Sequence, residues 1–131
     1  MQISVFDLII PTEDNGYCVF DPMLEEDKNV FFHMTAASNK ESIISHGFKS
    51  AKELSTGILE SVSYAQRSSS CFANLGHGFE SERVIFAVRF QPEALKEVVV
   101  NGLDIHVYKQ HIQPEILGVV HLPKGFKLSW I

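Results

Sequence analysis

The segment of residues 29–48, NVFFHMTAASNKESIISHGF, constrains the fold most, because it leads from a buried strand into a helix through a short polar stretch. Its apolar run at residues 30–32 (VFF) is rich in aromatic and β-branched side chains and predicts a strand inside the protein. His33 and Thr35 follow at the end of that strand. Since side chains two residues apart in an extended chain point to the same side, both are expected on one face.

A short helix is expected directly after this polar pair. Ser38 and Glu41 have the spacing of a capping box, in which both side chains accept hydrogen bonds from free amides at the helix start. Ile43 and Ile44 supply an apolar face, and Gly47 is placed to end the helix in a left-handed conformation. The unit is therefore a strand, two polar side chains, a helix and a glycine stop.

This unit resembles the first motif of the ADP-ribosyltransferase superfamily, in its histidine-bearing branch. That branch includes the poly-ADP-ribose polymerases, diphtheria-like toxins and rifampin-modifying transferases. Its members begin with an apolar strand, a His-x-Thr or His-x-Ser, a short helix and a Gly-Phe or Gly-Leu ending. Here the matching strings are FFHMT and SIISHGF, with Met34 where the family usually has glycine.

A second stretch resembles the family's next motif, a strand followed by a serine-rich helix. Residues 61–65 (SVSYA) predict the strand, and residues 66–75 (QRSSSCFANL) predict the helix, with Ser68 in its serine-rich entry. In register, Ser63 takes the position of the nicotinamide-stacking tyrosine and Tyr64 that of the neighbouring aromatic. Alternation puts these two side chains on opposite faces. Either the stacking ring is lost here, or a one-residue shift brings Tyr64 into the site.

The third resemblance lies near the C-terminus, where an acidic residue opens a predicted strand. Residues 104–107 (DIHV), followed by residues 112–120 (IQPEILGVV), match the family's catalytic-glutamate motif with Asp104 in the glutamate position. The rifampin-type transferases also use aspartate there. His106, on the face of Asp104, and Glu115, after a proline, are the alternatives for this position.

The remaining pattern predicts an α+β protein of many short strands separated by turns. Further strands are expected at residues 2–10, 17–20, 81–90, 97–100, 104–108, 116–122 and 126–131. The resemblance implies an ADP-ribosyltransferase-like split β-sandwich of mostly antiparallel strands with one or two short helices. We expect a single domain over residues 1–131, with an N-terminal hairpin and connector at 1–28 and the three motifs in a core at 29–131.

Composition narrows the classes of partner. The chain has 131 residues with 21% charged and a net charge of −5, typical of a soluble globular protein with little general affinity for nucleic acid. No apolar run approaches the ~20 residues that cross a bilayer, so no membrane partner is expected. The two cysteines make neither a disulfide framework nor a metal site, which predicts a cytoplasmic protein with no metal.

The resemblance implies an NAD-dependent mono-ADP-ribosyltransferase that uses NAD as substrate and releases nicotinamide. The acceptor is a protein, a nucleic acid or a small molecule, with protein favoured over nucleic acid by the charge. A histidine and a threonine suit the grip on ribose and carboxamide, and a carboxylate suits the positive charge that develops on the ribose. The implied catalytic residues are His33 and Asp104, and the implied cofactor-binding residues are His33, Thr35, Ser63, Tyr64 and Ser68.

Two alternatives remain open. Met34, Ser63 and Asp104 each depart from the family pattern and permit a catalytically inactive member that binds a nucleotide or a partner. An RNA 2′-phosphotransferase also uses His-x-Thr and NAD, but it needs arginines around its phosphate site. This chain carries arginine at 67, 83 and 89 alone and is poorly equipped for that reaction.

Overall fold

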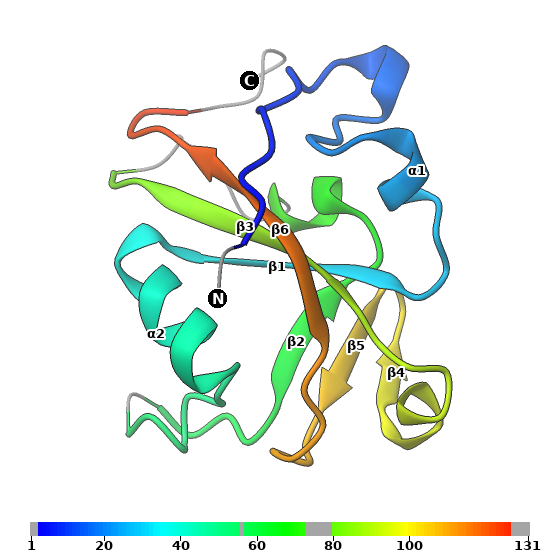
Figure 1. Ribbon diagram of the computed structural model, residues 1–131, viewed down its shortest axis with the longest axis vertical. Coiled ribbons are helices and arrows are strands. Elements are labelled where there is room, and N and C mark those ends of the chain that lie inside the picture. Colours follow the sequence, from blue (N-terminus) through cyan, green and yellow to red (C-terminus); the bar gives the residue numbers. More distant parts are fainter. Residues whose placement is uncertain (1–2, 56, 73–79, 127–131) are drawn as a thin grey trace.

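The computed structural model describes residues 3–55, 57–72 and 80–126 and shows an α+β fold built on one six-stranded antiparallel sheet (Figure 1). The strands follow the order β4-β5-β2-β1-β3-β6 across the sheet. Their bounds are β1 Val30–Ala36, β2 Val62–Ala65, β3 Arg83–Arg89, β4 Val99–Asn101, β5 Asp104–Val107 and β6 Glu115–Leu122. The α+β prediction is thus confirmed, as are the strands expected at the corresponding positions.

Strand β3 is buried on both faces, as its continuous apolar run predicts. Its residues alternate between two apolar clusters, with Phe86 in the one that holds Phe31 and Tyr64, and Ile85 in the one that holds Phe32. The pairing of β3 with β1 covers the full length of both strands, and β6 flanks its other side. Strand β1 is therefore held rigidly along the edge that faces β3.

The other edge of β1 is different, because β1 and β2 share one register pair, Phe32 with Ala65. In Figure 1, β2 and β5 cross the direction of β1 and β3 at a wide angle. The sheet therefore has two three-stranded halves, β4-β5-β2 and β1-β3-β6, which join at this pair. Beyond it, the His33 end of β1 leaves β2 and opens a gap in the backbone pairing.

The helix after β1 forms at the expected place but begins differently from the prediction. A 3₁₀ turn, η2 (Ala37–Asn39), precedes α2 (Lys40–His46), and the N-cap residue Asn39 makes no side-chain cap bond. The prediction that Ser38 and Glu41 form a capping box is therefore wrong, because the 3₁₀ turn places the first residue of α2 after Ser38. Gly47 ends α2 as expected, and its N–H donates to the Ile43 carbonyl. Its φ of +82° is positive, but its ψ of 177° lies outside the expected left-handed helical region.

Neither strand of the expected N-terminal hairpin forms among described residues 3–28, although the Ile9 amide donates to the Val19 carbonyl at 3.4 Å. Val5 instead forms a parallel bridge with Val119 of β6, and the Phe6 amide donates to the Val119 carbonyl at 2.9 Å. The chain then forms η1 (Glu13–Asn15) and α1 (Pro22–Glu25). The N-terminal segment makes its backbone hydrogen bonds with the outer strand β6. It can approach this closely because Phe6 packs over Gly118, which has no side chain.

The remaining predictions concern one turn, one helix and the C-terminal strand. The Asn101-Gly102 turn between β4 and β5 is confirmed, with φ of +64° at Gly102. The helix expected at residues 66–75 is a 3₁₀ turn, η3 (Ser68–Phe72), in its described part, and residues 73–75 lie outside the described residues. The 3₁₀ turn η4 (Ala94–Glu97) precedes β4. The strand expected at residues 126–131 falls almost wholly outside the described residues.

Within the described ranges, no helix has the length and apolar character needed to cross a membrane.

We predict that Gly118→Ala weakens the attachment of the N-terminal segment to β6. A methyl group at this position would overlap the ring of Phe6. Overpacking of this kind costs about 1–3 kcal/mol of unfolding free energy, which urea denaturation measures. The control is the double change with Phe6→Ala, which removes the overlapping ring and should cost less than the sum of the single changes. Strict additivity would contradict the described packing.

Candidate functional site

A cleft of about 250 Å³ lies where β1 and β2 diverge. Four residues predicted from the three motifs line it, namely His33, Ser63, Tyr64 and Asp104. They come from β1, β2 and β5, so the cleft lies across the junction of the two halves of the sheet. The other lining residues are Phe32, Met34, Ala65, Ser70 and Cys71.

His33 is held at the edge of this cleft in a defined protonation state. Its Nδ1 lies 2.8 Å from the Ser63 carbonyl oxygen. Because a carbonyl oxygen accepts and cannot donate, Nδ1 carries the hydrogen and Nε2 is the acceptor of the neutral ring. Burial lowers the pKa of His33, although the hydrogen bond to Ser63 partly opposes this effect. His33 is therefore a neutral imidazole at neutral pH.

Two aromatic rings fix the orientation of His33. Its ring centroid lies 5.2 Å from that of Phe48 and 5.5 Å from that of Tyr64. Tyr64 is 1% exposed, and burial raises the pKa of its hydroxyl group. The Tyr64 ring therefore packs against His33 from inside the core.

The pairing of β2 shows how Ser63 and Tyr64, the two candidates for the position of the stacking tyrosine, are oriented. Residues 62–65 pair with β5 in unbroken register, so Ser63 is exposed and Tyr64 is buried. The opposite-face expectation is confirmed, and the pairing of β2 carries no one-residue shift. Tyr64 nevertheless contributes to the wall of the cleft beside Ser63. Ser63 presents a hydroxyl group at the position that the family resemblance assigns to a stacking ring.

A polar group extends along the exposed side of β2 and β5. Ser63 Oγ lies 2.9 Å from Nδ1 of His106, and these two residues are directly opposed in the sheet. Asp104 is two residues from His106 on the same strand, so both side chains belong to one face. The strand pair therefore places a hydroxyl, an imidazole and a carboxylate side by side.

Thr35 borders a second, smaller cavity of about 110 Å³ on the side of α2. His33 lines both cavities, and the shared face expected for His33 and Thr35 is consistent with this placement. The Thr35 hydroxyl oxygen accepts a hydrogen bond from Asn39 Nδ2 at 2.9 Å. The structure therefore separates Thr35 from Asp104, with His33 between them.

Ser68 lies outside the cleft. It is fully buried, its backbone N–H and hydroxyl group both donate to the Glu25 carboxylate, and its Oγ accepts from the Val19 amide. The hydroxyl group thus already donates and accepts a hydrogen bond within the core, so it is not available to a ligand. Ser70, two residues further along η3, lines the cleft instead.

Sequence reasoning missed Cys71 and Ser70 as cleft residues. Helical spacing cannot find them, because η3 is a 3₁₀ turn with a different angular step per residue. Burial is the main cause that raises the pKa of the Cys71 thiol to about 12, and the carboxylates of Glu25 and Asp104 add to it. Cys71 therefore stays a thiol and lines the cleft as a weakly polar wall.

Glu115, the alternative for the acidic position, lies elsewhere. It is exposed at the start of β6, where it is the register partner of Arg89 in β3. Strand β6 forms an edge of the sheet and is separated from β2 by β1 and β3. Asp104 is the acidic residue among those that line the cleft.

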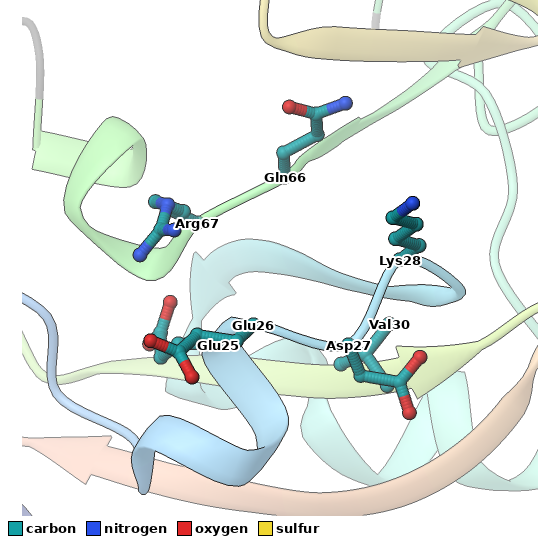
Figure 2. A pocket seen from close by; sticks show the side chains of 7 residues that line it. All are labelled: Glu25, Glu26, Asp27, Lys28, Val30, Gln66 and Arg67. Atoms are coloured by element: carbon teal, nitrogen blue, oxygen red, sulfur yellow. The ribbon is translucent and has the colours of Figure 1, made fainter.

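A larger cavity of about 400 Å³ lies between α1 and the chain after β2 (Figure 2). Figure 2 shows Glu25 and Glu26 on one side and Arg67 and Gln66 on the other. Two of its three acids have structural partners: Glu25 accepts hydrogen bonds from Ser68, and Asp27 accepts from the Asn29 amide and from Arg89. The Asn29 amide and then Arg89 lower the pKa of Asp27. None of the predicted catalytic or cofactor-binding residues lines this cavity, so the cleft at His33 is the better candidate.

Comparison with protein-family models, with curated proteins and with solved structures found no match for this chain.

We predict that acid destabilises the fold through His33. Its pKa in the folded protein lies below the unfolded value of about 6.5, so the unfolded chain binds the proton more tightly. Stability should therefore fall as the pH drops below about 6.5 and level off below the folded-state pKa. His33→Asn keeps a donor near Nδ1 without a titrating ring and should flatten this slope in denaturation curves at several pH values.

The matched control for this experiment is His111→Asn, since His111 is exposed in a loop. It should leave the pH slope of the wild type unchanged. Equal slopes in wild type and His33→Asn would contradict the burial of a neutral His33 ring.

Proposed function

We propose that this protein is an NAD-dependent mono-ADP-ribosyltransferase that transfers ADP-ribose to an acceptor and releases nicotinamide. The observation that carries the proposal is the convergence of the three motifs. His33, Ser63 and Asp104 are far apart in the sequence, yet all three line one cleft where the sheet divides. The division of the sheet into two three-stranded halves also supports the split β-sandwich that the resemblance implies.

The chemistry of the cleft suits cleavage of the bond between ribose and nicotinamide. Nε2 of His33 is an available acceptor for a ribose hydroxyl group, since Nδ1 is engaged with Ser63. The Asp104 carboxylate, which lines the cleft, supplies negative charge for the oxocarbenium-like state. Ser63 and Ser70 offer hydroxyl groups to the carboxamide of nicotinamide.

The size of the cleft indicates how the dinucleotide binds. Its volume of about 250 Å³ is below the roughly 300–1,000 Å³ of sites that enclose a whole small molecule. We assign it to nicotinamide and its ribose, with the rest of NAD extending past His33 toward the cavity at Thr35. Met34 lines the cleft where the family usually has glycine and narrows it.

The acceptor in this proposal is a protein or a small molecule in the cytoplasm, because the net charge of −5 disfavours a polyanion. The positions of the arginine side chains do not support an RNA 2′-phosphotransferase reaction in this cleft. Arg89 is paired with Asp27, Arg67 lines the separate cavity beside α1, and the described residues that line the cleft include no arginine.

A catalytically inactive nucleotide-binding protein is the second candidate. Its support is that Ser63, which cannot stack, is the exposed residue at the tyrosine position, while the Tyr64 ring in the wall of the cleft is buried. Such a protein would bind NAD without releasing nicotinamide.

We predict that NAD binds the wild type in calorimetry and that nicotinamide is released over time. His33→Ala should abolish binding, because it removes the Nε2 acceptor. Asp104→Asn should retain binding and lower nicotinamide release by about 10²–10³-fold, the usual effect of removing one group that stabilises transition-state charge.

Glu115→Gln is the matched control, since Glu115 is also an acidic residue at a strand start but lies away from the cleft. It should behave as the wild type in both assays. Binding without nicotinamide release by the wild type would select the inactive binder, and no binding by folded wild type would refute both candidates.

A further inference from the structure

His106 has no role in the proposed cleavage, yet it is tied to the site by a specific contact. Its Nδ1 lies 2.9 Å from Ser63 Oγ, and Ser63 lines the cleft. Asp104, also in the cleft, lies two residues away on the same face of β5. His106 itself is half-buried and does not line the cleft, but its hydrogen-bond partner Ser63 does.

The surroundings of His106 suit a proton acceptor. Across β5, the opposed residue of β2 is Ser63 and that of β4 is Val99, so Asp104 is the charged neighbour on this face. When Nδ1–H donates to Ser63 Oγ, Nε2 carries the lone pair. The same hydrogen bond persists after Nε2 takes a proton, because a protonated imidazole still donates from Nδ1.

We propose that His106 is the general base that deprotonates the acceptor, and that the acceptor is therefore a hydroxyl group. This inference rests on the proposed function of the cleft. A hydroxyl group is a weak nucleophile until its proton is removed, and imidazole is the side chain best suited to do so near neutral pH. Asp104 is occupied with the ribose cation and is not available as that base.

The transfer step balances without a further reactant. The bond between the ribose carbon and the nicotinamide nitrogen breaks, and its electron pair leaves with neutral nicotinamide. The acceptor oxygen forms the new bond to that carbon, and its proton moves to Nε2 of His106. Ser63 acts as a positioning residue, because its hydroxyl group holds the other ring nitrogen.

The same geometry disfavours a guanidinium acceptor. A carboxylate is the usual partner of a charged guanidinium, and the described residues on the exposed face of β2 and β5 supply one carboxylate, that of Asp104, which the proposed reaction uses for the ribose cation.

The test uses NAD with three simple acceptors: trifluoroethanol, ethanol and the guanidine compound agmatine. Wild type should form ADP-ribosyl products with the two alcohols in preference to agmatine. His106→Asn keeps a nitrogen near Nδ1 for Ser63 but cannot take the proton. It should bind NAD as the wild type does and transfer to the alcohols about 100-fold more slowly, the usual contribution of a general base.

A mechanism-specific readout separates a base from a structural residue. Loss of the base should affect ethanol more than trifluoroethanol, since the more acidic alcohol needs less help. Ser63→Ala provides a second variant, which retains the imidazole and should give a smaller loss of transfer. His111→Asn, the exposed histidine control, should leave the rates unchanged.

Each outcome is decisive. Equal transfer by His106→Asn and wild type, or a preference of wild type for agmatine, would overturn the inference while nicotinamide release still supported the transferase. If wild type released no nicotinamide at all, the proposed function would fall and the inference with it.

Discussion

The contact on which the rest of the structure depends is the junction of β1 and β2 at Phe32 and Ala65. Phe32 is 1% exposed and packs in the core between the sheet and the N-terminal segment, a burial that contributes about 1.5–3 kcal/mol. One register pair holds the two halves of the sheet together there, and neither strand can pair further because their directions diverge. The cleft exists because of this divergence.

The same junction explains why His33 can be both rigid and reactive. Being just past Phe32, it has lost the pairing of β1 with β2 but still lies opposite Phe86 of β3. Its ring bridges the gap to the Ser63 carbonyl and packs against Phe48 and Tyr64. Gln113 in turn holds Phe48 in place through two hydrogen bonds to its backbone. A loop far along the chain thus supports the orientation of the imidazole.

Much of the candidate site could be predicted from local pattern, and some could not. Alternation along β2 correctly separated Ser63 from Tyr64, because one strand has a strict two-residue period. The pattern did not show which serine of residues 68–70 lies in the cleft. Ser68 donates hydrogen bonds to Glu25 in the core, and Ser70 lines the cleft. Which serine of three faces a cavity depends on the turn type and on a distant carboxylate, and neither is written in the run itself.

The sequence by itself determined the six strands of the sheet, the turn at Gly102, the end of α2 at Gly47 and the same-face placement of Asp104 and His106. These follow from side-chain periodicity and from backbone angles, which are local properties. The tertiary structure alone decided that Val5 would bridge β6 instead of forming a hairpin, and that Ser63 would join His33 to His106. Such contacts join residues far apart in the chain, and their register is set by burial of the whole core.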